Sequence, residues 1–268
     1  MLPTQIILLG GGASLRYLGA LDKGLFNFLQ NKFVIGINYS YKFINTTCTL
    51  GIDEPLYNSP EHNKELSTLP LVIWKSYKHL SQGHPNTIFL HANKKYDRDL
   101  KGGIYRASLS GIFALSLAIK LLDLSQKQEI LSPSGIKIQP EICLLGFDYG
   151  PQMKDGKVVL DSQGKAITHW YQEEFKHRGT GKINWFQQTW LDAKTMKRIP
   201  YSELEWRPFI NEKEVKIFNV GGTSKIQMFP HISYEEFFKK EFNTVSNQDE
   251  VRKELRETLL KIKTENNI

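Results

Sequence analysis

The sequence has few cysteines and no long apolar run, and each absence excludes a class of protein. Its 268 residues include two cysteines, Cys48 and Cys143, each inside an apolar stretch. A disulfide-dense secreted scaffold is therefore excluded, and two buried thiols in a reducing compartment are expected. No segment reaches the ~18 consecutive apolar residues that predict a transmembrane helix. The N-terminus lacks the basic flank and cleavage site of a signal peptide, so we expect a cytoplasmic protein.

The histidines between residues 62 and 91 and the acid Asp53 also lack the spacing that is typical of metal sites. Four of the histidines, His62, His79, His84 and His91, share no metal-ligand spacing. No paired acid accompanies Asp53, so we expect no dedicated metal there. The formal net charge is +7, which favours acidic partners such as nucleotides, nucleic acid or an anionic membrane surface without choosing among them.

The first fourteen residues carry the clearest local signal. The apolar run 5–9 ends in Gly10, Gly11 and Gly12, and Ser14 opens a segment with leucines at helical spacing. This order predicts a buried strand, a glycine loop and a helix, with Ser14 as the N-cap. Loop amides and a helix N-terminus together can bind phosphate. The alternative is a tight turn that binds nothing.

Two named glycine motifs do not fit this loop. The lysine of GxxxxGK[ST] is missing, and the third glycine of GxGxxG would fall on Leu15. A P-loop kinase is therefore not indicated, and the evidence for a dinucleotide site is weak.

Polar residues follow several of the other predicted strands. Strands are expected at 32–38, 47–53, 69–74, 86–90, 141–150 and 215–220. Asn38 either contacts a base or ribose or caps the segment after it, and Asp53 is placed for a sugar hydroxyl. Gly146, Asp148 and Tyr149 lie at the carboxyl end of a central strand, where ribose contacts and stacking are expected. A capping aspartate in a turn is the alternative.

A second helix N-terminus that could bind an anion is predicted at the start of a long apolar helix. Ser110 and Gly111 precede this helix, and Arg106 lies just upstream, where it could pair with a phosphate. Near the C-terminus, Ser233 and Glu236 form a capping box. Residues 249–263 form a charged helix with one apolar face, which most commonly packs on a core.

Residues 151–200 have little apolar periodicity but many aromatic side chains. Such a stretch predicts a lid or substrate loop, and two histidines in it, His169 and His177, are candidates for a general base. We therefore expect a core at 1–150, a lid insertion at 151–200, and a last strand and helices at 201–268 that complete the same domain.

Four segments together resemble a known superfamily: GGGASL, RASLSG, LLGFDYG and IFNVGGTSKIQMFPHISYEEF. They are similar to the Rossmann-type proteins that include the family 42 sialyltransferases and proteins resembling 6-hydroxymethylpterin diphosphokinase. The resemblance implies an α/β fold: a Rossmann-like, mostly parallel sheet with helices on both faces and an irregular lid. Ala13 replaces a proline usual in the sialyltransferase loop, and Tyr149 and Tyr171 are the available matches for its donor-binding tyrosines.

The sialyltransferase branch implies a glycosyltransferase with a nucleotide-sugar donor and no required cofactor. Its nucleotide-binding positions correspond to Gly10, Gly11, Gly12, Ser14, Asn38, Ser110, Gly111, Gly146 and Asp148. Asp53 and Tyr149, which lie at predicted strand ends, are further expected nucleotide contacts. Its lid base best matches His177, with His169 as the competitor, and Arg106 would offset leaving-group charge. The resemblance does not choose among a glycan, a small molecule and a modified nucleic acid as the acceptor. It also leaves the oligomeric state open, with a homo-oligomer as one alternative.

Two other functions remain open. The diphosphokinase branch would transfer diphosphate from ATP to a pterin-like alcohol, with Mg²⁺ held by Asp53 and Asp148. The other alternative is a non-catalytic module that binds nucleotides or nucleic acid.

Overall fold

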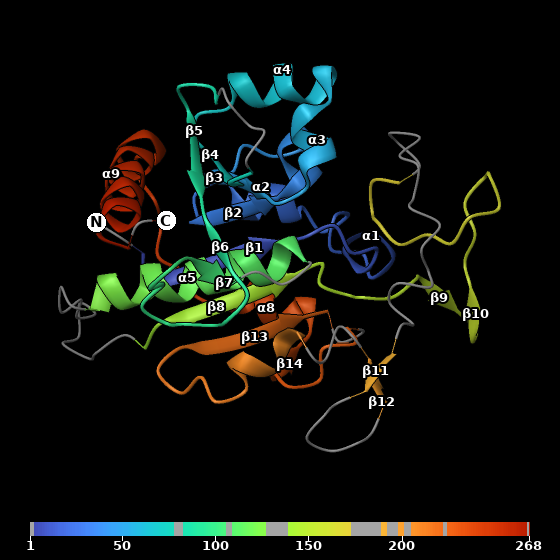
Figure 1. Ribbon diagram of the computed structural model, residues 1–268. Helices are drawn as coiled ribbons and strands as arrows, with labels where there is room; N and C mark the ends of the chain where they lie inside the picture. The colour runs from blue at the N-terminus through green and yellow to red at the C-terminus, as the bar shows by residue number, and fades with distance from the viewer. Residues whose placement is uncertain are drawn as a thin grey trace.

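The computed structural model describes residues 3–77, 83–105, 109–126, 139–172, 189–191, 198–200, 205–221, 224–266 and 268. An eight-stranded sheet of order β14-β13-β8-β1-β2-β3-β4-β5 forms its centre (Figure 1). Its strands are β1 (Gln5–Leu9), β2 (Val34–Ile37), β3 (Cys48–Gly51), β4 (Val72–Lys75), β5 (Thr87–Leu90), β8 (Glu141–Leu145), β13 (Lys216–Val220) and β14 (His231–Ile232). All seven neighbouring pairs are parallel, which confirms the predicted Rossmann-like α/β fold.

The order of the strands reverses at β1. From β1 the chain builds outward through β2, β3, β4 and β5, and it then returns to add β8, β13 and β14 on the other side. Leu8 consequently pairs with Ile35 of β2 on one side and with Leu144 of β8 on the other. In open parallel sheets, ligands bind at the carboxyl ends of the strands beside such a reversal. Here that place lies between β1 and β8.

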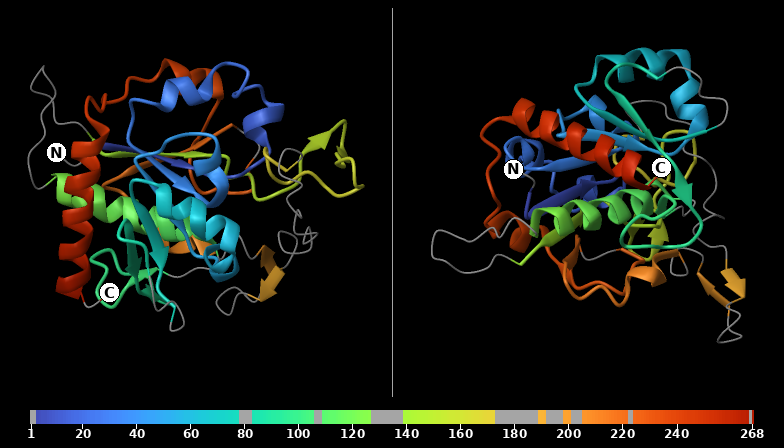
Figure 2. Two further views of the ribbon diagram at one scale, coloured as in Figure 1. Left: turned by 90° about the horizontal axis from the view of Figure 1, so that it is seen from above. Right: turned by 60° about the vertical axis from the view of Figure 1, so that its left-hand side comes forward.

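Helices cover both faces of the sheet because successive side chains of each strand point to opposite faces. Ile6 and Leu8 of β1 join a core with helices α5 (Ser110–Gln126) and α9 (Gln248–Asn266). Ile7 and Leu9 join a second core with α1 (Ser14–Tyr17), α2 (Leu25–Leu29) and α8 (Tyr234–Lys239). Figure 2 shows the sheet between these two sets of helices.

Smaller elements surround this core. Helices α3 (Glu54–Asn58) and α4 (Pro60–Thr68) pack Tyr57 and Leu66 against Trp74 of β4. The 3-10 helices are η1 (Asn38–Lys42) and η2 (Arg207–Phe209). Three two-stranded ribbons complete the description: β6 (Ala92–Asn93) with β7 (Ile104–Tyr105), β9 (Met153–Lys154) with β10 (Lys157–Val158), and β11 (Thr189–Leu191) with β12 (Arg198–Pro200).

The helix predicted after the glycine loop is broken in two. Helix α1 ends at Tyr17, and α2 begins at Leu25. Between them Gly19 and Gly24 have φ of 73° and 78°, left-handed values that a helix does not contain. Gly19 follows the C-cap of α1, and Gly24 is the N-cap of α2. The predicted N-cap is also wrong, because Ala13 holds that position and Ser14 is the first helical residue.

The C-terminal predictions are confirmed. The Ser233 hydroxyl accepts from the Glu236 amide, and the Glu236 carboxylate accepts from the Ser233 amide, so the capping box is complete. Leu255, Leu259 and Ile262 of α9 are buried in the core. Cys48 and Cys143 are both buried and free, as predicted. No helix in the ranges described above is long and apolar enough to cross a membrane.

Candidate functional site

The structure brings the predicted nucleotide-binding residues to the carboxyl edge of the sheet. Gly10 follows β1, Asn38 follows β2, Asp53 lies two residues beyond β3, and Gly146 follows β8. Parallel strands end at one edge, so these positions gather there with the start of α5. They form two hydrogen-bonded groups, one around Asp148 and one around Asn38.

The glycine loop packs directly on the loop after β8. The Gly10 amide donates to the Leu145 carbonyl and the Gly12 amide to the Gly146 carbonyl, each at 2.8 Å. A Cβ at Gly10 would lie 2.7 Å from the Gly146 oxygen, closer than real Cβ atoms approach. The glycines are therefore needed for this contact between loops. Two of the three loop amides that were expected to bind phosphate bond to the protein itself in this arrangement.

The Asp148 carboxylate binds the start of α1. Its Oδ2 accepts from the Ser14 amide at 2.6 Å and its Oδ1 accepts from the Ser14 hydroxyl at 2.5 Å. The Ser14 hydroxyl also lies 3.1 Å from the Tyr234 hydroxyl. Burial raises the pKa of Asp148, and the two bonds from Ser14 oppose that rise. A protein carboxylate thus stands where phosphate was expected at this helix.

The second group centres on Asn38. The Ser110 hydroxyl donates to the Asn38 Oδ1 at 3.2 Å, and the Asn38 amide donates to the Asp53 Oδ2 at 3.4 Å. Asn38 holds φ at 53°, a left-handed value that asparagine tolerates better than most residues. Its side chain thus joins three chain segments instead of capping the segment that follows. Burial raises the pKa of Asp53, while Lys75 and the Asn38 amide oppose the rise.

The start of α5 adjoins the loop after β8. A Cβ at Gly111 would collide with the Phe147 ring and lie 3.0 Å from the Tyr149 hydroxyl. Tyr149 also has a left-handed φ, 52°, and its ring packs 5.7 Å from that of Trp206. Burial raises the pKa of Tyr149 well above its usual value, so its hydroxyl keeps its proton at neutral pH. This hydroxyl lies beside Gly111, at the start of α5.

A segment from beyond β10 lies over the glycine loop. His169 pairs with Gly12 as an isolated antiparallel bridge, and the Trp170 amide donates to the Gly11 carbonyl at 3.1 Å. A Cβ at Gly11 would lie 2.7 Å from the His169 Cδ2 and 2.8 Å from the Tyr171 hydroxyl. The Thr168 hydroxyl lies 2.8 Å from the His169 Nδ1 and so orients the ring. His169 therefore stands at the rim of the glycine loop.

Two expected catalytic residues, His177 and Arg106, lie outside the described residues. Of the two candidate bases, His169 is the one whose surroundings can be given. Within the described ranges, no three His, Cys, Asp or Glu side chains are grouped so that they could hold a metal ion. Asp53 and Asp148, the expected metal ligands of the diphosphokinase alternative, accept hydrogen bonds from Asn38 and Ser14 respectively.

Sequence reasoning missed a polar chain beside Asn38. His62 lies between two hydroxyls, with Nε2 3.3 Å from Tyr39 and Nδ1 3.2 Å from Tyr41. Tyr41 in turn donates to Glu65 at 2.7 Å. The Tyr39 ring also packs 5.6 Å from that of Tyr171, which ties this chain to the segment over the glycine loop. His62 is more than twenty residues from either tyrosine, so no local spacing could have revealed the group.

Comparison with protein families, with curated proteins and with solved structures finds no match. The superfamily resemblance therefore stays a prediction, and the chemistry of the site is argued from its geometry.

Proposed function

We propose that the chain is a glycosyltransferase that moves a sugar from a nucleotide donor to a hydroxyl acceptor, without a required metal ion. The observation that carries the proposal is the Asn38 group. Asn38 joins Ser110 and Asp53 at the carboxyl ends of β2 and β3, next to the first turn of α5. Amide, hydroxyl and carboxylate groups at such an edge suit the ribose and base of a nucleotide.

The donor phosphate is best placed at the start of α5. Helix α5 is 17 residues long, and its N-terminal amides and dipole favour an anion. The start of α1 is less suitable, because Asp148 already accepts from its first amide and a second anion there would be repelled. The Tyr149 hydroxyl lies next to Gly111, at the same helix start.

The transfer itself is a displacement at the anomeric carbon. The acceptor oxygen forms a bond to C1 of the sugar, and the bond from C1 to the phosphate oxygen breaks. The electron pair leaves with the nucleoside phosphate, and the acceptor proton passes to a general base. His169 is our candidate for that base because the Thr168 hydroxyl orients its ring at the edge of the glycine loop. Base catalysis of this kind contributes about 10²–10⁴-fold in rate.

A thermal-shift panel tests the donor class. CMP, UMP, UDP, GDP, ATP and their sugar conjugates would be added to the purified protein with and without Mg²⁺. A ligand at about 100 times its Kd should add about 2.7 kcal/mol of stability. We expect a metal-independent shift with one nucleoside phosphate. A shift with ATP and Mg²⁺ alone, together with AMP release, would replace the proposal with diphosphoryl transfer, and no shift at all would overturn it.

Variants of the two histidines test the base. His169→Gln should keep donor binding and lose turnover, and His177→Ala is measured beside it as the alternative. Loss of turnover in His177→Ala alone would transfer the role to His177. Full activity in both variants would remove histidine base catalysis from the mechanism.

A further inference from the structure

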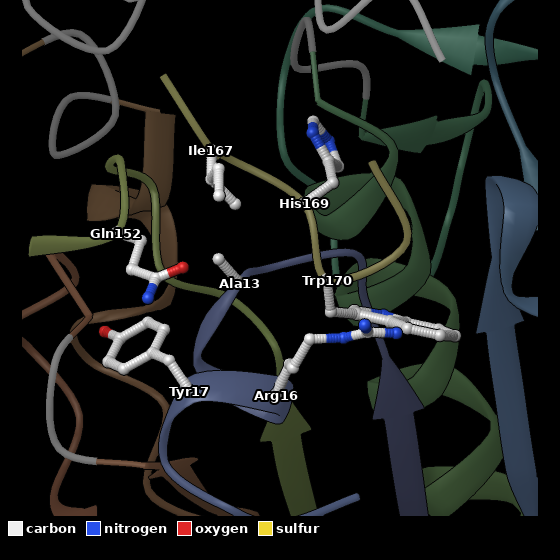
Figure 3. Close-up of a pocket in the computed structure, with 7 residues that line it drawn as sticks. All are labelled: Ala13, Arg16, Tyr17, Gln152, Ile167, His169 and Trp170. Carbon is white, nitrogen blue, oxygen red and sulfur yellow. The ribbon is translucent and has the colours of Figure 1, made fainter. Parts of the chain in front are cut away.

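A pocket lies between helix α1 and the segment after β8. Its volume is about 250 Å³, and its walls are Ala13, Arg16, Tyr17, Gln152, Ile167, His169 and Trp170 (Figure 3). Helix α1 and the residue before it supply one wall, and the segment after β8 supplies the other. Pockets for whole drug-sized ligands measure roughly 300–1,000 Å³. This pocket therefore has room for about one ring with its substituents.

The wall that follows β8 is held by hydrogen bonds within its own segment. The backbone amide of Gln152 donates to the Ile167 carbonyl at 2.7 Å, and the backbone amide of Ile167 donates to the Val159 carbonyl at 3.0 Å. The buried Gln172 side chain accepts from the Thr168 amide at 3.0 Å and donates to Asp161 at 2.7 Å. Since these bonds fix the backbone on both sides of His169, the pocket is preformed.

Two residues of the pocket wall also contact the glycine loop. His169 lines the pocket and also packs on Gly11, while Trp170 lines it and donates from its indole Nε1 to the Gly10 carbonyl at 3.4 Å. A ligand in the pocket would therefore lie next to His169, the candidate base.

The side chains around the pocket define what it can recognise. Tyr17, Ile167 and Trp170 offer apolar surface to the face of a ring. Arg16, an exposed residue in the last turn of α1, brings a permanent positive charge, and Figure 3 shows its side chain extending alongside Trp170. Gln152 adds an amide on the opposite side, next to Tyr17. Apolar ring faces beside one cation and one amide suit a sugar ring that carries an anionic group.

We propose that this pocket is the acceptor subsite and that it takes a sugar ring bearing a carboxylate or a phosphate. Arg16 binds the anionic group, Tyr17 contacts the ring face, and His169 lies beside the hydroxyl that reacts. In the transfer, that hydroxyl oxygen bonds to C1 of the donor sugar, its proton goes to His169, and the nucleoside phosphate leaves. The acceptor role rests on the proposed function, whereas binding in the pocket can be measured without a donor.

Calorimetry on the full chain tests the pocket with three probes: methyl β-glucuronide, glucose 6-phosphate and methyl β-glucoside. We expect the two acidic sugars to bind more tightly than the neutral one, and the tighter of the two identifies the anion. Arg16→Gln should weaken the acidic sugars by about 10-fold or more and leave the neutral sugar unchanged. Tyr17→Ala should weaken all three. Arg256→Gln, which makes the same charge change on α9 away from the pocket, should alter none.

Three outcomes would overturn the proposal. They are equal affinity for all three sugars, unchanged affinity of Arg16→Gln for the acidic sugars, and no binding of any probe. The nucleotide panel separates this failure from that of the proposed function. Nucleotide binding without sugar binding removes the acceptor pocket alone, and acidic-sugar binding without nucleotide binding removes the acceptor role together with the transferase.

Discussion

The Ser14 amide, the first of helix α1, donates to the Asp148 carboxylate at 2.6 Å, although the two residues are 134 positions apart in sequence. The Ser14 hydroxyl donates to the other carboxylate oxygen, and both residues are buried. The bond joins the loops after β1 and β8 across the point where strand order reverses. It also gives the glycine loop an internal anion, so the phosphate of a ligand is better placed at α5.

This pair predicts a pH-dependent stability. Because burial raises the pKa of Asp148, the folded state holds its proton more tightly than the unfolded state, whose pKa is about 3.9. The contribution of Asp148 to stability is therefore fully present below about pH 3.9 and falls as the pH rises to the folded pKa. Asp148→Asn keeps the shape and has no such proton. The free energy of unfolding of Asp148→Asn, minus that of the parent, should therefore increase as the pH rises from about 3.9 to the folded pKa. Denaturant titrations at several pH values measure this difference.

Asp148→Ala is the matched comparison, since it leaves the Ser14 amide and hydroxyl without their acceptor. It should cost about 1–3 kcal/mol at neutral pH, whereas Asp148→Asn keeps an acceptor for the amide and should cost less. A stability difference between Asp148→Asn and the parent that is constant from pH 4 to pH 7 would contradict the assigned titration.

Gly11→Ala should disturb the segment over the glycine loop. The added Cβ would lie 2.7 Å from the His169 Cδ2 and 2.8 Å from the Tyr171 hydroxyl, so one or both side chains must move. Overpacking of this kind typically costs about 1–3 kcal/mol, and turnover should fall because His169 is displaced. Melting curves and transfer assays measure the two effects.

The control for that variant is Gly19→Ala. A Cβ at Gly19 meets nothing within 4 Å, but the backbone has φ of 73°. It should cost about 1 kcal/mol through backbone strain alone and leave turnover unchanged. Equal turnover in Gly11→Ala and Gly19→Ala would show that the contact with His169 has no bearing on the reaction.

Two variants of Asn38 separate its conformation from its hydrogen bonds. Asn38→Gly accepts the left-handed φ of 53° and loses the amide that joins Ser110 and Asp53, whereas Asn38→Ala loses the amide and is strained as well. If the amide organises the nucleotide site, both should weaken nucleotide binding by a similar factor, about 10-fold for a hydrogen-bonded group. Asn38→Ala alone should show the added loss of stability. Normal nucleotide affinity in Asn38→Gly, measured by calorimetry, would exclude the amide from the site.

Much of this edge could be predicted from sequence because the signal is local. Apolar runs that end in Gly10, Asn38 or Gly146 mark strand ends, and parallel pairing brings such ends to one edge without knowledge of any contact. Long-range contacts left no such pattern: neither the bond from Ser14 to Asp148 nor the chain from Tyr39 through His62 could be read from spacing. The break of the first helix does have a local signal, because Gly19 and Gly24 stand within the predicted helix and outweigh its leucine periodicity.

The last prediction concerns helix α9, which one buried arginine anchors by donating hydrogen bonds to the segment before β3. Arg252 donates to the Thr47 carbonyl at 3.2 Å, to the Thr46 carbonyl at 3.0 Å and to the Asn45 side chain at 2.9 Å. Arg252→Met fills similar space but leaves both buried carbonyls without this donor, so it should cost about 3 kcal/mol of unfolding free energy. Arg256→Met, four residues along the same helix, should change stability by less than about 0.5 kcal/mol. Equal losses in the two variants, measured by denaturant titration, would mean that the hydrogen bonds of Arg252 do not hold α9 in place.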